Sequence, residues 1–143
     1  MIAVRVGQPS VARMAAVHRC ADVLEQIGAI APAYRAAMVA REQAASTYMG
    51  EGVAVPHGLE ESAGLVRRDA LAVLQFPGGV DWAGHHVVVC VAIAAGDDSH
   101  IEMLASIAAM LLDPARAAQL RAARDPEEIM RMFCADRPGA DRG

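Results

Sequence analysis

Residues 50–58 read Gly-Glu-Gly-Val-Ala-Val-Pro-His-Gly, and this stretch gives the clearest indication of the fold. Residues 53–55 form an apolar run that follows two glycines and ends at Pro56, a pattern typical of a short buried strand. The strand should deliver His57 onto a turn, where Gly58 is free to adopt a positive φ. We therefore expect a histidine presented on a stiff turn at the end of a strand.

The sequence before this strand has helical periodicity. Apolar residues recur at helical spacing over residues 11–27, and Gly28 is a candidate C-cap for this helix. Pro32 suits a first helical position, so a second helix is expected over residues 33–45, with Arg41 on its later turns. Two helices should therefore precede the strand.

Three further segments have the composition of strands. Residues 1–6 alternate weakly between apolar and polar side chains. Residues 70–76 form an apolar run that the Pro-Gly-Gly turn at 77–79 should end. Residues 87–94 are a near-continuous β-branched run, as expected of a strand that is covered on both faces.

The last third of the chain contains clear signals for the starts of helices. Ser99 and Glu102 are spaced as a capping box, which places His100 at the first helical position. Asp113 and Asp125 are each followed by proline, the pattern of an acidic N-cap with proline just inside the helix. The helices expected from these signals cover about residues 100–112, 114–124 and 126–134. Helices at both ends of the chain, around several short strands, indicate an α/β sandwich.

Length and composition favour one globular domain. The chain has 143 residues, of which 55% are apolar and 21% are charged, and this is sufficient for a sizeable core. We expect a single domain over residues 1–136. A flexible C-terminal tail is expected over residues 137–143, which are polar and contain glycine and proline.

The charge pattern and the cysteines argue against several classes of protein. The net charge is −4 and no run of basic residues is visible, so nucleic acid is not an expected partner. The longest apolar stretch, residues 87–95, is far shorter than the roughly 20 residues that a membrane span needs, so no membrane insertion is expected. A signal peptide is not evident, and the three cysteines are widely separated. The cytoplasm is the simplest compartment for such a chain.

His57 is the first candidate for chemistry. A neutral imidazole is nucleophilic near pH 7 and can accept a phosphoryl group through a labile P–N bond. Such a site also needs fixed positive charge to hold the phosphoryl oxygens. From periodicity alone, the simpler interpretation of His57 is a turn histidine that makes a structural hydrogen bond.

Two further residues could assist His57. His100, at the start of a helix, would lie among unpaired N–H groups at the positive end of the helix dipole, where a neutral ring could donate to a phosphate. Arg41 could offer a bidentate guanidinium to phosphate. Taken alone, each is better interpreted as a solvated surface residue. No phosphate loop, zinc motif or cofactor signature is visible, so neither a cofactor nor a metal is expected.

Five stretches carry a further signal when they are taken together. They are Arg41-Glu42, residues 46–58, residues 74–82, residues 91–95 and residues 99–104. In this order they resemble the mannitol/fructose-type enzyme IIA domain (EIIA type 2) of the bacterial phosphoenolpyruvate-dependent sugar phosphotransferase system. The glycine-acid-glycine approach to Val-Pro-His-Gly, with a second histidine opening a later helix, is the most specific part of the resemblance.

The resemblance implies a fold and a set of roles. The fold is α/β, a mixed, mostly parallel five-stranded sheet flanked by helices on both faces. His57 would be the tele-phosphohistidine that accepts phosphate from the carrier protein HPr and passes it to a cysteine of a cognate enzyme IIB, which serves the membrane component IIC. Arg41 would bind the phosphoryl group, and His100 would assist by hydrogen bonding. The site neighbours implied are Glu51, Pro56 and Gly58.

The sugar and the biological role stay more open than the chemistry. The resemblance implies mannitol or a related sugar. The connection between Trp82 and Val87 is shorter than the mannitol type leads us to expect, which leaves the substrate branch open. An alternative role is a phosphorylation-sensing regulatory module of the nitrogen-related or regulator-binding kind. A relic that keeps only the fold is disfavoured, because His57, Arg41 and His100 are all present.

Overall fold

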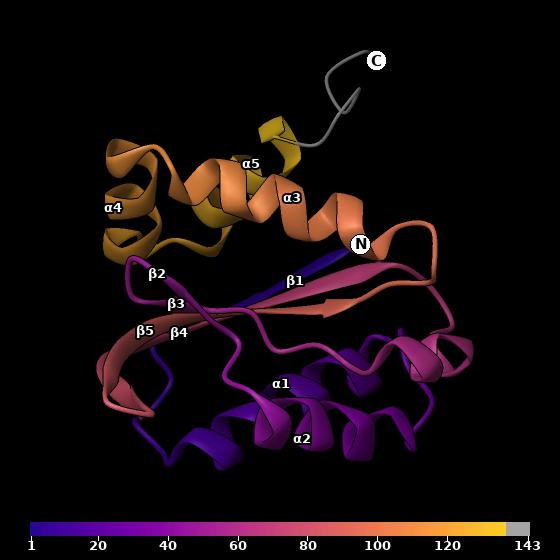
Figure 1. The fold of residues 1–143 in the computed structure, drawn as a ribbon. Coiled ribbons are helices and arrows are strands. Elements are labelled where there is room, and N and C mark those ends of the chain that lie inside the picture. The colour runs from indigo at the N-terminus through magenta and orange to yellow at the C-terminus, as the bar shows by residue number, and fades with distance from the viewer. Residues whose placement is uncertain (137–143) are drawn as a thin grey trace.

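The computed structural model describes residues 1–136, so the tail expected over residues 137–143 lies outside the described residues. The elements in chain order are β1 (Ile2–Arg5), α1 (Arg13–Gln26), α2 (Tyr34–Ala44), β2 (Tyr48–Gly50), β3 (Val53–Ala54), a 3-10 helix η1 (Glu60–Leu65), β4 (Ala70–Trp82), β5 (His85–Ala94), α3 (His100–Leu111), α4 (Pro114–Ala122) and α5 (Pro126–Asp136). Figure 1 shows their arrangement around one sheet.

The sheet has five strands in the order β1-β4-β5-β3-β2. The β1–β4 and β3–β5 pairs are parallel, whereas the β4–β5 and β2–β3 pairs are antiparallel. The expectation of a mixed five-stranded sheet with helices on both faces is therefore confirmed. Parallel pairs are two of the four and not the majority, because β4 and β5 form one long hairpin and β2 folds back beside β3.

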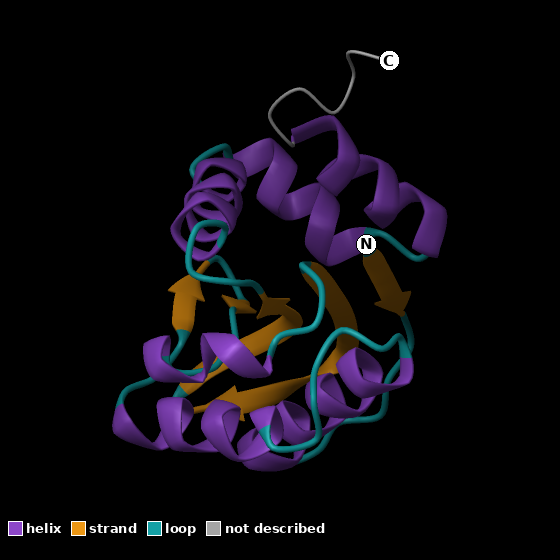
Figure 2. Cartoon of the chain, turned by 90° about the vertical axis from the view of Figure 1, so that its right-hand side faces the viewer, coloured by secondary structure: helices purple, strands orange, loops and turns teal. Residues whose placement is uncertain are grey.

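Helices cover both faces of the sheet. In Figure 1, α1 and α2 lie on one face, and α3, α4 and α5 lie on the other; Figure 2 shows the same two layers from the side. Alternate residues of β4 serve the two layers: Ala72 and Leu74 pack toward α1 and α2, and Leu71 and Val73 pack toward the C-terminal helices. Because β5 is covered in the same way, its sequence is almost uninterruptedly apolar.

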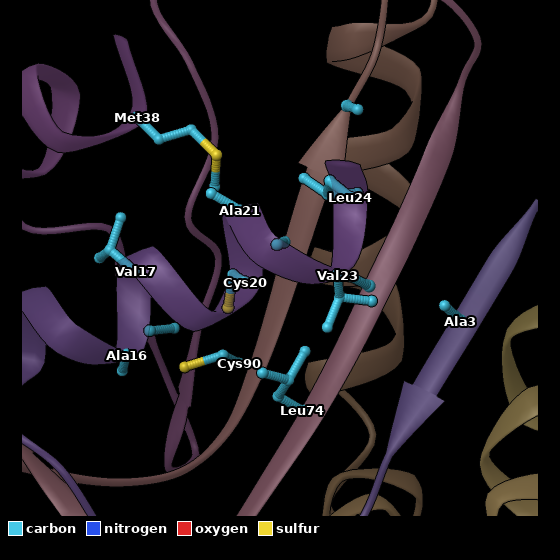
Figure 3. Packing of buried hydrophobic residues seen from close by; sticks show 14 of the residues in the cluster. Ala3, Ala16, Val17, Cys20, Ala21, Val23, Leu24, Met38, Leu74 and Cys90 are labelled. Carbon is cyan, nitrogen blue, oxygen red and sulfur yellow. The ribbon is translucent and has the colours of Figure 1, made fainter. Parts of the chain in front are cut away.

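The core beneath α1 is built from small and branched side chains. Figure 3 shows Cys20 of α1 facing Cys90 of β5, with Leu74 and Leu24 nearby. Both cysteines are fully buried and unbridged. Each occupies the place of a small hydrophobic residue, which lets the helix approach the sheet closely.

Two segments differ from the sequence-based expectation. β4 does not end at the Pro-Gly-Gly turn but continues through it to Trp82, with a shift of register between Gln75 and Val80. Pro77 lies within this irregularity, where its missing N–H removes no regular ladder bond. β2 was not predicted either, because its three residues directly follow a helix and precede a glycine turn.

The C-terminal helices start at the positions expected. The Asp113 carboxylate accepts a hydrogen bond from the N–H of Ala115 at 3.0 Å, and Asp125 accepts one from Glu127 at 3.0 Å. These caps fix the two sharp connections between the helices. None of the helices within residues 1–136 combines the length and the apolar character that a membrane-spanning helix requires.

Candidate active site

His57 lies on an extension of the sheet directly after β3. Its backbone forms a parallel bridge with Ile93 of β5, and the N–H of Ile93 donates to the carbonyl of Pro56 at 2.9 Å. Pro56 is itself buried, so the turn has little freedom to move. The His57 side chain therefore has a fixed origin at one end of the sheet, and the residue is 8% exposed.

One hydrogen bond determines the chemical form of the His57 ring. Nδ1 lies 2.7 Å from the carbonyl oxygen of Val55. A carbonyl oxygen can only accept, so Nδ1 carries the ring proton and Nε2 keeps its lone pair. The neutral ring thus has one nucleophilic nitrogen, and it is the one far from the main chain.

The surroundings of His57 favour this neutral form. Burial is the main cause that lowers the pKa of His57, because it disfavours the charged ring. Nearby His100 and Arg41 lower the same pKa further, while the Val55 hydrogen bond and the Glu42 carboxylate act in the opposite direction. The net effect is a lowered pKa, so His57 is neutral and nucleophilic at pH 7.

Gly58 is required by a close contact and not by a positive φ. The expectation that Gly58 adopts a left-handed conformation is wrong, since its φ lies outside that range. A Cβ at this position would come 2.5 Å from the ring carbons Cε1 and Cζ of Tyr34. The N–H of Gly58 also donates to the Tyr34 hydroxyl at 2.9 Å, and that hydroxyl lies 3.3 Å from the carbonyl of Ile93. Tyr34 thus ties the turn after His57 to α2 and β5.

His100 begins α3 as expected, and its ring reaches His57. The two ring centroids are 4.9 Å apart, and the planes cross at 76°. The capping box expected at Ser99 is wrong: Ser99 has helical backbone angles, and its side chain makes no capping hydrogen bond. The Ser99 side chain therefore caps no first-turn N–H group of α3, and the N–H of His100 donates to the carbonyl of Gly96 at 3.2 Å. The His100 ring itself can still donate to an anion.

Arg41 lies in the last turn of α2 and lines the same open pocket as His57 and His100. Its Nη1 donates to the carbonyl of Ala45 at 2.6 Å, which leaves other guanidinium donors available. The pocket rim includes Ile101, whose side chain is prominently exposed at 77%. The structure therefore brings together the three residues that the sequence singled out.

Glu51 does not belong to this pocket. It forms the turn between β2 and β3, at the opposite end of β3 from His57. Its φ of +55° is left-handed, and Arg121 of α4 donates to its carbonyl at 2.9 Å and lies 3.9 Å from its carboxylate. The structure places Glu51 in a hairpin contact with α4 and not beside the phosphate-accepting position that the resemblance implied.

The arrangement suits group transfer. One unprotonated imidazole nitrogen lies beside a second imidazole, a guanidinium and the start of a helix, which together can hold an anion. Tyr34, which is hydrogen-bonded to the turn after His57, was not predicted, since it occupied an ordinary position of an amphipathic helix. Within residues 1–136, no cluster of three or more potential metal ligands is found.

Comparison with known proteins agrees with this geometry. Residues 4–135 match the sequence profile of the family described as phosphoenolpyruvate-dependent sugar phosphotransferase system, EIIA 2. The chain belongs to this family. The likeness inferred from the short motifs thus extends over nearly the whole chain.

The relatives of this EIIA chain are of two lengths. It is 39% identical over 118 residues to the mannitol-specific phosphotransferase enzyme IIA component of Staphylococcus aureus, covering 82% of each chain. It is also 42% identical over 123 residues to the multiphosphoryl transfer protein of Xanthomonas campestris pv. campestris, covering 85% of this chain but only 15% of that protein. The chain therefore matches only about a seventh of the length of the longer relative.

The same fold occurs in solved structures. The complex of enzyme IIA and phosphorylated enzyme IIB for mannitol from Escherichia coli contains a chain that superposes with a TM-score of 0.85 at 26% identity, covering 92% of this chain and 94% of that one. The crystal structure of the mannitol IIA protein from the same organism superposes with a TM-score of 0.82 at 27% identity, covering 91% and 94%.

Proposed function

We propose that Nε2 of His57 accepts a phosphoryl group from the phosphohistidine of HPr and passes it to a cysteine of a cognate enzyme IIB. The observation that carries this proposal is the 2.7 Å hydrogen bond from Nδ1 of His57 to the carbonyl of Val55. It leaves Nε2 as the unprotonated nitrogen, in a pocket shared with Arg41 and His100. Membership of the EIIA family and the complex of a similar protein with phosphorylated enzyme IIB support the partners.

Both transfers follow from the fixed tautomer. In the first, the Nε2 lone pair forms a bond to phosphorus while the P–N bond to the donor histidine breaks and returns an electron pair to that ring. In the second, a thiolate of the acceptor attacks phosphorus, and the P–Nε2 bond breaks to restore neutral His57. The proton stays on Nδ1, bonded to the Val55 carbonyl, throughout, so His57 needs no proton transfer.

The surrounding residues supply charge and alignment. Arg41 would neutralise the equatorial phosphoryl oxygens, and His100 would donate a hydrogen bond to them. Such transfer demands positioning more than covalent chemistry from the protein. Exposed Ile101 at the rim offers an apolar contact for each partner, in keeping with a small and transient interface.

The transported sugar would be mannitol or a related one, since the membrane component IIC selects it. The mannitol-specific relative in Staphylococcus aureus supports this assignment. The proposed exchange with HPr and enzyme IIB takes place in the cytoplasm. The longer relatives imply that related domains also operate within larger phosphoryl-transfer chains.

The direct test is incubation of the chain with enzyme I, HPr and labelled phosphoenolpyruvate. Wild type should take up label that is acid-labile and alkali-stable, as expected of a P–N bond, and His57→Ala should take up none. His18→Ala is the matched control, because His18 lies on α1 beside Arg35 and outside the pocket. Label that survives His57→Ala contradicts the proposal. Label that enters His57 but reaches no enzyme IIB favours the regulatory role.

A further inference from the structure

Glu42 is a charged side chain in the core beneath the active site. Its side chain is fully buried, although it follows Arg41 directly in the last turn of α2. The guanidinium of Arg13 approaches to 4.0 Å from one carboxylate oxygen. A buried carboxylate is costly unless it is paired and hydrogen-bonded, so the contacts that retain it here need an explanation.

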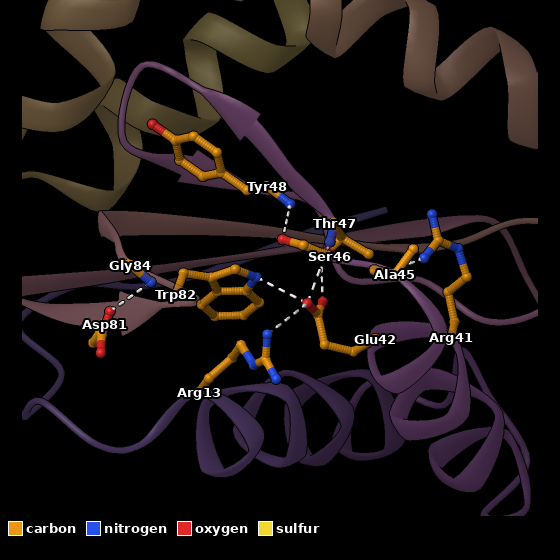
Figure 4. Close-up of polar contacts among 10 residues, drawn as sticks. All are labelled: Arg13, Arg41, Glu42, Ala45, Ser46, Thr47, Tyr48, Asp81, Trp82 and Gly84. Atoms are coloured by element: carbon orange, nitrogen blue, oxygen red, sulfur yellow. Dashed lines mark hydrogen bonds and ion pairs between the residues drawn. The ribbon is translucent and has the colours of Figure 1, made fainter.

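Three donors from two residues satisfy the Glu42 carboxylate (Figure 4). The N–H and the hydroxyl of Thr47 donate to its two oxygens at 3.2 and 2.5 Å, and Nε1 of Trp82 donates at 3.0 Å. The two Thr47 bonds close the turn that joins α2 to β2. The carboxylate thus holds that turn against the end of β4.

A continuous chain of hydrogen bonds runs from this turn to His57. The N–H of Thr47 is bonded to Glu42, and the carbonyl of Thr47 accepts the N–H of Val55 at 3.0 Å. The carbonyl of Val55 in turn accepts Nδ1–H of His57 at 2.7 Å. Val55, whose carbonyl sets the tautomer of His57, is therefore hydrogen-bonded directly to Thr47, which Glu42 holds in place.

The same turn also determines where Arg41 points. Neighbouring positions of an α-helix project about 100° apart, so an inward Glu42 leaves Arg41 on an adjacent face of α2, toward the pocket. The guanidinium of Arg41 then donates to the carbonyl of Ala45, which lies inside the turn that Thr47 closes. Figure 4 shows Arg41 and Glu42 on either side of this turn.

We propose that Glu42 is a positioning residue for phosphoryl transfer, which aligns Arg41 and His57 with each other by fixing the turn over residues 42–47. It contacts neither the phosphoryl group nor the partner proteins. The proposal rests on the function proposed for His57. Glu42 would act on His57 and Arg41 only through hydrogen bonds and charge. The carboxylate also counteracts the lowering of the His57 pKa, which provides a readout independent of transfer.

The test substitutes Glu42→Gln, which keeps the size of the side chain but replaces one acceptor oxygen with an NH2 group facing donors. We expect kcat for transfer from phospho-HPr to fall about tenfold or more, because small misplacements of reacting groups are costly. The KM for phospho-HPr should change by less than about threefold, since the docking surface is untouched. Nitrogen-15 NMR of the His57 ring should show a lower pKa and a smaller fraction of the Nδ1–H tautomer.

Gln75→Leu is the matched control. Gln75 is a buried polar residue of β4 whose amide donates to three carbonyls at the end of α4, on the other face of the sheet. Its replacement should lower the melting temperature as Glu42→Gln does, while kcat and the His57 ring signals stay at their wild-type values. An equal fall of kcat in both variants would mean that Glu42 is only structural, and would overturn the proposal.

The outcomes separate this proposal from the proposed function. Wild-type kcat and an unchanged His57 ring in Glu42→Gln overturn the positioning role, even if His57 is labelled. If wild type takes up no label, the proposed function fails, and the ring pKa and tautomer still decide whether Glu42 positions His57. If Glu42→Gln does not fold, Thr47→Val removes the hydroxyl bond alone and should lower kcat about threefold or more; an unchanged kcat then overturns the proposal.

Discussion

The ring of Tyr34 occupies the space that a side chain at Gly58 would need, and its hydroxyl accepts the Gly58 N–H at 2.9 Å. The contact joins α2 to the turn that presents His57, across 24 positions of sequence. Burial raises the pKa of Tyr34, so the hydroxyl stays protonated and can also serve the carbonyl of Ile93. The stiffness of the His57 turn therefore comes from tertiary packing as well as from Pro56.

Gly58→Ala should destabilise the protein. The added Cβ meets Tyr34 at 2.5 Å, so either the ring or the turn must shift, and such overpacking costs about 1–3 kcal/mol. Urea unfolding followed by circular dichroism measures this loss. Gly64→Ala is the control, because a Cβ at that position would have nothing within 4 Å and the backbone φ there is ordinary; it should stay within about 0.5 kcal/mol of wild type. Equal stability of the two variants would contradict the close contact.

The lowered pKa of His57 predicts a pH dependence with a definite sign. Between the folded pKa and the unfolded value of about 6.5, the unfolded state binds more protons, so stability rises with pH in that window. The contribution is complete above about pH 6.5 and is lost as pH falls toward the folded pKa. Urea unfolding at several pH values should show wild type losing more stability on acidification than His57→Gln. Parallel curves for the two proteins would rule out a lowered pKa.

Two replacements of Arg41 should separate the effect of its positive charge on the transfer rate from the effect of its planar guanidinium. Arg41→Ala removes a group that can grip the phosphoryl oxygens, and a charge-assisted hydrogen bond of this kind contributes about 1.5–3 kcal/mol. Rapid-quench measurement of transfer from phospho-HPr should therefore show a fall of roughly tenfold to more than a hundredfold. Arg41→Lys should recover only part of the rate, because an ammonium lacks the planar fork.

A control for the Arg41 series is Arg124→Ala. Arg124 lies between α4 and α5, donates to the carbonyls of Ala122 and Ala123, and is outside the His57 pocket. Its replacement should leave the transfer rate unchanged. A rate that falls equally in both alanine variants would point to general electrostatic attraction of HPr instead of a local role for Arg41.

His100→Ala should affect transfer more than acceptance. Nε2 of His57 and its Val55 hydrogen bond are untouched, so His57 should still take up label from phospho-HPr. Loss of the ring 4.9 Å away removes one donor to the phosphoryl oxygens, and onward transfer to enzyme IIB should slow by roughly a hundredfold. Chase of labelled protein with enzyme IIB gives this rate, and an unchanged rate would remove His100 from the mechanism.

Local sequence patterns predicted the structure correctly where contacts between nearby residues determine it. The apolar run that became β5 was recognisable because both of its faces are covered, and Asp113 and Asp125 cap helices with oxygens two residues away. The motif around His57 and the position of His100 were also readable, because strand, turn and helix start each leave a short pattern.

The errors arose where distant contacts decide the local structure. β4 passes through Pro77 because β5 remains beside it on the far side of the irregularity, which no local pattern reports. Gly58 is constrained by Tyr34 from another element, so its backbone freedom was the wrong explanation. Ser99 has the side chain of a cap but a helical backbone, which removes the geometry that capping needs.

The single unprotonated nitrogen of His57 has a consequence for how partners share the chain. Under the proposed function, with Nδ1 bonded to the Val55 carbonyl, the donor and the acceptor must both approach Nε2 through the same opening. They cannot be bound productively at once, so each must leave before the other arrives. Under the proposed role, excess unphosphorylated HPr should inhibit delivery to enzyme IIB competitively, and throughput should depend on the ratio of the two partners as much as on the amount of either.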